Sequence, residues 1–305
     1  MSPQLALLVN PAARGGRTLR LLEPVARRLR AGGAELSVIV GDDATDALER
    51  ACTAVSERPD ALVAFGGDGL VHLAVQAVAG TDVPLGIIPV GTGNDIASAL
   101  GLPLGDPVAA ARTVLRMRPR TVDAARVRAG AGEELFAGVV CCGFDSRVNE
   151  RANRLTWPAG MSKYVLAMAQ ELRLFRPIPF RITLDEAEVI EREAMLVAVA
   201  NTRSYGAGMR VCPDARPDDG LLDVMILGAV SKGEFLRVFP SVYRGTHVGH
   251  RAVSVRRVRS VRVEAAGPAA PAKAMGSAVA YADGERVGEV PLHCEVRPGA
   301  LRVIV

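Results

Sequence analysis

Apolar and polar positions along the first 120 residues predict strands and helices in turn. Short apolar runs typical of buried strands occupy residues 5–9, 36–40, 62–65 and 85–90. Apolar side chains at helical spacing lie between or after them, at residues 19–29, 44–56, 70–79, 95–100 and 108–117. Strands that alternate with helices in this rhythm predict a parallel sheet covered by helices on both faces.

The pattern changes after about residue 121. Short β-like runs separated by Gly, Pro and Asp occupy residues 122–128, 135–142, 180–184, 195–200, 222–227, 253–255, 260–265, 278–282 and 292–296. One helical segment, at residues 161–175, interrupts them. This pattern predicts a second domain built as an antiparallel, sandwich-like sheet, and the last apolar run, 301–305, fits either domain.

The composition is that of a globular protein, with 49% hydrophobic and 23% charged residues among 305. No apolar stretch reaches ~18 residues and the first residues lack a basic region, so we expect neither a membrane-spanning helix nor a signal peptide. The five scattered cysteines and the lack of a Cys-x-x-Cys motif favour a reducing compartment over structural zinc.

The net charge of +4 comes mainly from arginine, because the chain has only three lysines. Two arginine clusters, at residues 27–30 and 251–262, are interpreted as solvated side chains, while contact with anionic lipid headgroups stays open. Few aromatic residues interleave with them, which disfavours nucleic-acid binding.

Three runs combine glycine with a carboxylate: Gly66-Gly67-Asp68-Gly69, Gly91-Thr92-Gly93-Asn94-Asp95 and Asp283-Gly284-Glu285. The first two follow predicted strands and precede predicted helices, where an open α/β sheet binds phosphates. Carboxylates repel phosphate, so they indicate a divalent cation or a proton acceptor beside it. Metal-assisted phosphoryl transfer is the hypothesis. A tight turn accounts for the first run alone, and a hairpin turn that displays Glu285 accounts for the third.

On these motifs the chain resembles the soluble diacylglycerol kinase catalytic family, which includes YegS-type lipid kinases and extends to sphingosine kinases. The resemblance covers nearly the whole chain and is carried by the loop at residues 10–16, by the three runs above together with Ile88-Pro89-Val90, and by Asp218-Asp219-Gly220-Leu221-Leu222-Asp223.

The resemblance implies a fold as well as a reaction. It implies a Rossmann-like N-terminal domain, related to NAD kinase and phosphofructokinase, and a C-terminal β-sandwich, with the catalytic cleft between them. The nucleotide-binding domain is expected at residues 1–122 with a returning strand at 297–305, and the lipid-substrate domain at 123–296.

The resemblance also implies which residues bind ATP and Mg²⁺. The residues expected to bind ATP are Asn10, Gly15, Gly16, Gly66, Gly67, Gly69, Gly91, Thr92, Gly93 and Asn94. Asp68 is expected at the metal–phosphate centre, joined by Asp95 and Asp123, which would hold magnesium or orient the substrate hydroxyl. The carboxylate of Asp219 and the carbonyl of Leu221 are the expected ligands of a structural magnesium, with a simple turn as the alternative.

Glu285 is the expected general base, because an alcohol must lose its proton as it accepts a phosphoryl group. The implied activity is ATP-dependent phosphorylation of diacylglycerol to phosphatidic acid. A sphingoid base or another lipid alcohol as acceptor, and an inactive nucleotide- or lipid-binding module, are the alternatives. We expect a cytoplasmic enzyme that contacts the inner face of the membrane transiently, and the sequence leaves a homodimer open.

The chain departs from the family pattern at Leu70, His72 and Ser98. His72 is interpreted as a histidine on a helix surface, with a polar contact that substitutes for the missing hydroxyl near the phosphates as the alternative. Residues 161–175 and the preceding Trp157 fit an acyl channel or a bilayer contact, and core packing explains them equally well.

Overall fold

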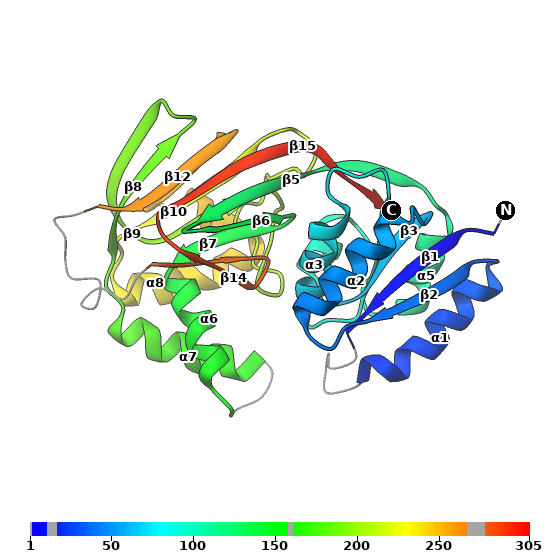
Figure 1. Ribbon diagram of the computed structural model, residues 1–305. Coiled ribbons are helices and arrows are strands. Elements are labelled where there is room, and N and C mark those ends of the chain that lie inside the picture. The colour runs from blue at the N-terminus through cyan, green and yellow to red at the C-terminus, as the bar shows by residue number, and fades with distance from the viewer. Residues whose placement is uncertain (1, 11–16, 158–160, 267–277) are drawn as a thin grey trace.

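Four parallel strands, in the order β2-β1-β3-β4, form the sheet of the first lobe (Figure 1). They are β1 (Gln4–Val9), β2 (Glu35–Val40), β3 (Ala61–Gly66) and β4 (Leu85–Pro89). The computed structural model describes residues 2–10, 17–157, 161–266 and 278–305. Every residue of β3 and β4 is buried, because helices cover both faces of a parallel sheet.

Five helices surround this sheet: α1 (Arg17–Ala31), α2 (Ala44–Ser56), α3 (Asp68–Val78), α4 (Asp95–Ala99) and α5 (Pro107–Leu115). Apolar residues of α1 and α5 share one buried cluster with one face of the strands. Apolar residues of α2, α3 and α4 share a second cluster with the opposite face. The predicted alternation of strands and helices is therefore confirmed, and α3 and α4 begin at the two aspartates that follow β3 and β4.

The second lobe is a curled, mainly antiparallel sheet. Its strands are β5 (Pro119–Ala129), β6 (Gly132–Phe136), β7 (Val139–Gly143), β8 (Ile178–Leu184), β9 (Glu188–Ala200), β10 (Leu222–Gly228), β11 (Val253–Val258), β12 (Ser260–Ala265), β13 (Val279–Ala282), β14 (Glu285–Glu289) and β15 (Leu292–Ile304). The helices α6 (Phe144–Arg154), α7 (Met161–Leu174) and α8 (Lys232–Val238) and the 3₁₀ segments η2 (Phe239–Arg244) and η3 (Thr246–Gly249) lie along it. Phe144 joins these segments, with ring centroids 5.3 Å from Phe175 and 5.0 Å from Phe235.

Strands β5 and β15 run side by side from one lobe to the other (Figure 1). Near its end, β15 also pairs with β4, through Val303 and Leu85. The residues 292–296 and 301–305, predicted as separate runs, thus belong mostly to one strand with an irregularity between Arg297 and Leu301. The buried core changes between Ala124 and Ala125; the proposed domain limits at 122 and 296 stay a prediction.

Three features of the second lobe differ from the sequence-based expectation. The run 135–142 is two strands, because the chain turns at Ala137 and Gly138. Helices α6 and α8 were not predicted, whereas α7 was. None of the helices in the part of the chain described combines the length and hydropathy needed to cross a membrane.

Candidate active site

The two glycine-rich loops after β3 and β4 touch each other through their backbones. A Cβ placed on Gly91 would lie 2.5 Å from the Cα of Gly67, so neither position has room for a side chain facing the other. The loops meet because parallel strands bring their carboxyl ends to one edge of the sheet. This edge presents the N-termini of α3 and α4 to any ligand that enters from the second lobe.

Asn94 shapes the second loop. Its backbone is left-handed, with φ of 56°, and its side chain accepts a hydrogen bond from the Gly91 N–H at 2.8 Å and donates one to the Gly91 carbonyl at 2.9 Å. Asparagine tolerates this conformation better than most residues. Asn94 was expected to contact ATP, but its amide is used to close the loop that displays Thr92 and Gly93.

The carboxylates of Asp68 and Asp95 both lie close to Gly93. A Cβ on Gly93 would come within 2.9 Å of the Oδ2 of Asp68 and 3.2 Å of the Oδ2 of Asp95. Burial, and then the neighbouring Asp95 carboxylate, raises the pKa of Asp68 to about 6. The structure therefore brings together two of the carboxylates expected at the metal–phosphate centre.

Asp95 also connects the two lobes. Its carboxylate accepts hydrogen bonds from the Ala207 N–H at 2.7 Å and the Gly208 N–H at 2.8 Å, both from the segment between β9 and β10. Gly206, Ala207 and Gly208 all have positive φ, which turns successive N–H groups toward one anion. Burial raises the pKa of Asp95, and these two hydrogen bonds act against that rise.

Asp283 and His72 form a second connection between the lobes. The Asp283 carboxylate accepts hydrogen bonds from the N–H groups of Ala137, Gly138 and Val139 at 3.0, 2.8 and 3.1 Å. His72 contacts Asp283 through Nδ1 and Glu134 through Nε2, each at 3.2 Å. The interpretation of His72 as a surface histidine was wrong. It is buried, with only 6% of its surface exposed.

The charge of His72 follows from this position. Burial lowers the pKa of the imidazole, but the hydrogen bonds and charges of Asp283 and Glu134 outweigh that effect and raise the pKa to about 10. A doubly protonated ring donates to both carboxylates at once. His72 is thus a cationic link between α3 and the hairpin of β13 and β14.

Glu285, the first residue of β14, lies over the first glycine loop. A Cβ on Gly69 would come within 2.5 Å of the Oε1 of Glu285. The hairpin turn before it contains Asp283, with φ of 52°, and Gly284, with φ of 96°. The run Asp283-Gly284-Glu285 is a hairpin turn, as predicted, and this turn brings Glu285 to the sheet edge where Asp68 lies.

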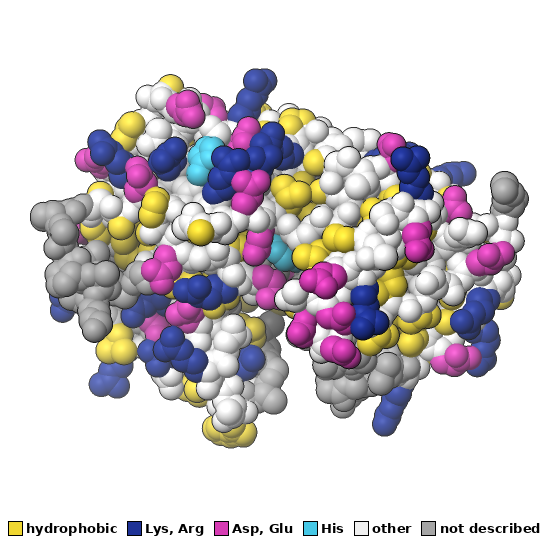
Figure 2. All heavy atoms as spheres, viewed as in Figure 1, with side chains coloured by type: hydrophobic (Ala, Val, Ile, Leu, Met, Phe, Trp, Pro, Cys, Tyr) yellow, Lys and Arg dark blue, Asp and Glu magenta, His cyan; other side chains and the backbone are white. Residues whose placement is uncertain are grey.

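A cavity of about 650 Å³ extends from these carboxylates into the second lobe. Its mouth is lined by Asp68, Gly69, Gly93, Asp95 and Glu285. Figure 2 shows a hollow between the lower parts of the two lobes, with acidic side chains gathered beside it. Beyond the mouth, side chains of α6, α7, α8 and η2 make the lining mainly apolar, with Phe144, Met168, Phe235 and Phe239 among them. Cavities of this size accommodate one small organic ligand or one lipid chain.

The residues at the mouth fit a magnesium ion that a nucleotide brings with it. Protein-bound Mg²⁺ commonly uses one or two carboxylates together with phosphates and water. Asp68 accepts a hydrogen bond from the Ile96 N–H at 3.3 Å through Oδ1, and its Oδ2 faces Gly93. Within the described residues, no group of three or more His, Cys, Asp and Glu side chains is arranged to hold a metal by itself.

The second expected metal site does not fit magnesium in the same way. One carboxylate oxygen of Asp219 is paired with the Arg257 guanidinium, and the other accepts a hydrogen bond from the Leu221 N–H at 3.1 Å. The guanidinium also approaches Asp223 to 3.9 Å. A guanidinium is therefore already paired with the carboxylate that was expected to bind magnesium.

Asp123 lies away from the cavity. Its carboxylate accepts hydrogen bonds from the N–H groups of Gly220 and Gly299, each at 2.8 Å, and the residue is buried. The structure therefore does not bring Asp123 to the cavity mouth with Asp68, and gives it a contact with the turn before β10. Asn10 follows β1, while Gly15 and Gly16 lie outside the described residues.

Sequence reasoning missed several residues that line the cavity. Asp145 and Asn149 lie on α6, and Tyr205 donates a hydrogen bond to the Oδ2 of Asp145 at 2.6 Å. The spacing of Phe144, Val148 and Ala152 was a signal for this helix. The segment Gly206-Ala207-Gly208 was a signal for an anion-binding turn, but nothing local identifies Asp95 as its partner.

Comparison with known proteins gives consistent matches over both lobes. Residues 4–127 match the diacylglycerol kinase catalytic domain, and residues 138–305 match the YegS C-terminal NAD kinase beta sandwich-like domain. The chain is 41% identical over 302 residues to a diacylglycerol kinase of Mycobacterium tuberculosis, covering 99% of this chain and 94% of that protein. It is 30% identical over 262 residues to a diacylglycerol kinase of Bacillus subtilis, covering 84% of each.

Solved structures agree on the fold. The crystal structure of a diacylglycerol kinase from Bacillus anthracis is similar with a TM-score of 0.72 at 22% identity, covering 99% of this chain and 96% of that one. An NAD kinase from Archaeoglobus fulgidus, solved in complex with ATP, is similar with a TM-score of 0.53 at 15% identity, covering 100% of this chain and 94% of that one. The expected α/β fold, with an NAD kinase-like relative and a β-sandwich-like second domain, is confirmed.

Proposed function

This chain belongs to the diacylglycerol kinase catalytic family of lipid kinases, and we propose that it transfers the γ-phosphoryl group of ATP to the hydroxyl of diacylglycerol, forming phosphatidic acid. The observation that carries the proposal is the position of Glu285. This carboxylate lies against Gly69 at the mouth of an apolar cavity, and Asp68, the residue before Gly69, lines the same mouth. A proton acceptor, a phosphate-binding edge and a lipid-sized space therefore meet at one place.

ATP is the proposed phosphoryl donor. The backbone of the loops at Gly67 and Gly91 has no side chain in the way, and the N-termini of α3 and α4 favour anions. The NAD kinase that shares this fold was solved with ATP. We place the ATP phosphates beside Thr92 and Gly93, which line the cavity mouth.

Asp68 is the proposed protein ligand of magnesium. When bound, the ion would neutralise charge that develops on the transferring phosphoryl group. Asp68 must then be ionised, and its burial, followed by its proximity to Asp95, makes ionisation costly unless a cation is present. Asp95 acts by holding Ala207 and Gly208 at the cavity wall.

Glu285 is the proposed general base. Its side chain takes the proton from the lipid hydroxyl as the oxygen attacks the γ-phosphorus, and a positioned base typically contributes 10²–10⁴-fold to the rate. His72 supports this role from a distance, because it fixes Asp283, two residues before Glu285. The lobes must keep their relative position for Glu285 to meet ATP.

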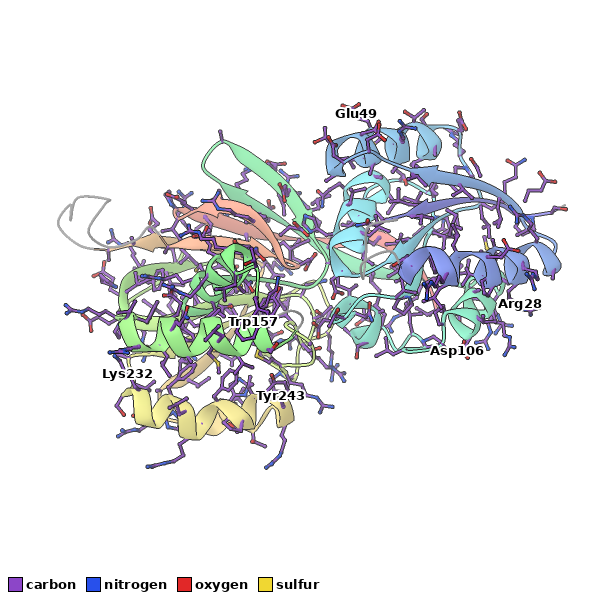
Figure 3. The ribbon with its side chains drawn as sticks, turned by 90° about the horizontal axis from the view of Figure 1, so that it is seen from below. Arg28, Glu49, Asp106, Trp157, Lys232 and Tyr243 are labelled. Atoms are coloured by element: carbon purple, nitrogen blue, oxygen red, sulfur yellow. The ribbon has the colours of Figure 1, made fainter. Side chains whose placement is uncertain are left out.

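The proposed acceptor enters from a membrane surface. Large apolar side chains are exposed on α7, α8 and η2 and just before α7, at Trp157, Val165, Leu236 and Tyr243. Trp157 and Tyr243 both lie on the side of the second lobe seen in Figure 3. Tryptophan and tyrosine favour the interface between water and lipid. We expect a variant with both Trp157 and Tyr243 replaced by Ser to float less with phospholipid vesicles than the wild-type protein. Unchanged flotation would remove this membrane contact from the proposal.

A panel of acceptors tests the function. The purified protein, with Mg²⁺ and radiolabelled ATP, is offered diacylglycerol, a sphingoid base and NAD, with the lipids in mixed micelles. We expect labelled phosphatidic acid and little product from the other acceptors, and transfer about 10²–10⁴-fold slower from the E285Q variant. Faster transfer to the sphingoid base would replace the acceptor in this proposal, and no transfer to any lipid would contradict it.

A further inference from the structure

Helix α6 carries a line of polar side chains into the apolar cavity. Asp145, Asn149 and Asn153 are four residues apart, so they lie on one face of the helix, and all three line the cavity. Phe144 and Val148 flank them on the same lining. Figure 3 shows α6 and α7 (green) beside α8 and η2 (yellow), the segments that enclose this space.

The same helix is attached to the hairpin that carries Glu285. The Arg286 Nε donates a hydrogen bond to the Oε1 of Glu150 at 3.2 Å, and the Asn153 side chain is hydrogen-bonded to the Tyr281 phenol. Residue 149 is one helical turn from residue 153, at a Cβ separation of about 6 Å. Asn149 is therefore held close to the β13–β14 hairpin and on the cavity side of α6.

Asn149 differs from its two neighbours on the line. Tyr205 donates to the Oδ2 of Asp145, whose Oδ1 has no hydrogen-bond partner among the described residues, and Tyr281 engages Asn153. Among the residues that the structure describes, none forms a hydrogen bond with the Asn149 amide. The side chain is half-buried. Its Nδ2 is a donor of two hydrogen bonds and its Oδ1 an acceptor, and the residue lines the same cavity as Glu285.

The chemistry of a diacylglycerol matches this donor. Its reacting hydroxyl is close to two ester groups, whose carbonyl oxygens accept hydrogen bonds and donate none. A sphingoid base has no ester carbonyl, so it offers the amide N–H no acceptor of this kind.

We infer that Asn149 determines acceptor specificity: its amide donates a hydrogen bond to an ester carbonyl of the lipid while the neighbouring hydroxyl meets Glu285. The inference rests on the proposed function and adds to it a residue that distinguishes ester lipids from lipids without carbonyls.

The experiment compares two acceptors that differ only in these carbonyls, dioctanoylglycerol and its dioctyl ether analogue, each in mixed micelles. The wild-type protein is expected to use the ester with a kcat/KM about three- to tenfold higher, the effect of one hydrogen bond. In N149L this advantage is lost through a higher KM for the ester, while kcat/KM for the ether stays within about twofold. V148A, an apolar change on the same lining, affects both lipids equally.

The outcomes separate this inference from the proposal beneath it. Equal use of both lipids by the wild-type protein, or an equal loss for both in N149L, would overturn the role of Asn149 and leave the kinase activity intact. Absence of transfer to either lipid by the wild-type protein would contradict the proposed function, and this inference with it.

Discussion

The Oε1 of Glu285 lies so close to Gly69 that a Cβ on the glycine would come within 2.5 Å of it. The two residues are more than 200 positions apart in the chain and belong to different lobes. Glycine is needed here for a close approach, since its φ is not in the left-handed region. The contact fixes where a proton acceptor sits relative to the phosphate-binding edge.

A G69A variant tests this contact. The added methyl group would push the flexible end of Glu285 aside, at little cost in stability but with a misplaced base. We expect kcat to fall about 10–100-fold, since a misplacement of about 1 Å has effects of this size. The melting temperature, measured by differential scanning fluorimetry, should stay within about 2 °C of the wild-type value.

G91A is the matched control for that variant. Its Cβ would lie 2.5 Å from the Cα of Gly67, so it collides with backbone that cannot move aside cheaply. We expect a lower melting temperature together with lower activity. If G69A melted as low as G91A, its loss of activity would no longer report on Glu285.

The strands and helices of the first lobe could be predicted because each depends on a local pattern. The strand at residues 62–65 is continuously apolar, and it is buried on both faces as β3. The edge where Asp68 and Asp95 meet followed from the rule that parallel strands end together. The local sequence was sufficient for that part of the site.

Other features depend on contacts that no local pattern encodes. Helix α6 has few apolar residues and many arginines and asparagines, so its helical period was faint. His72 lies on α3 in a segment that reads as an ordinary helix, and its partner Asp283 is 211 residues away. Asp123 was expected near the metal and the phosphates, but its carboxylate accepts hydrogen bonds from backbone N–H groups of the turn before β10 and of the irregular part of β15.

His72 gives the fold a defined dependence on pH. Its pKa is raised from 6.5 to about 10 in the folded protein, so its stabilising effect is complete below the unfolded value and is lost as the pH rises through about 10. We expect H72L to lower the free energy of unfolding in urea by about 1–3 kcal/mol near pH 6. The difference from wild type should shrink steadily toward pH 10. A difference that stayed constant over this range would show that His72 acts without its charge.

The Asp68 carboxylate is expected to be needed for activity but to destabilise the folded protein when it is ionised. Its pKa is raised from 3.8 to about 6, so the folded protein is destabilised by the charged form as the pH rises from about 4 to about 6, and fully so above that. D68N should be inactive and, at pH 7.5, at least as stable as wild type, with the stability difference vanishing near pH 4. Thermal melts at both pH values provide the measurement, and a D68N variant that is less stable at pH 7.5 would contradict this account.

The ion pair of Arg257 with Asp219 predicts that removal of Mg²⁺ does not change the stability of the protein. Because the guanidinium already pairs with Asp219, the melting temperature of the wild-type protein without ATP should be the same, within about 1 °C, in EDTA and in millimolar Mg²⁺. R257A should have a lower melting temperature, because the loss of an exposed ion pair lowers the free energy of unfolding by ~0–1 kcal/mol. Mg²⁺ should recover part of that loss. A wild-type protein that loses stability in EDTA would restore Asp219 and Leu221 as magnesium ligands.

Single-turnover transfer of the γ-phosphoryl group from ATP to diacylglycerol, by the wild-type protein and by E285Q, tests the central claim most directly. Glu285 is exposed at the cavity mouth, so its replacement should leave the melting temperature and ATP binding unchanged. The account predicts phosphatidic acid from the wild-type protein and a rate about 10²–10⁴-fold lower from E285Q. Transfer by E285Q at the wild-type rate would contradict it.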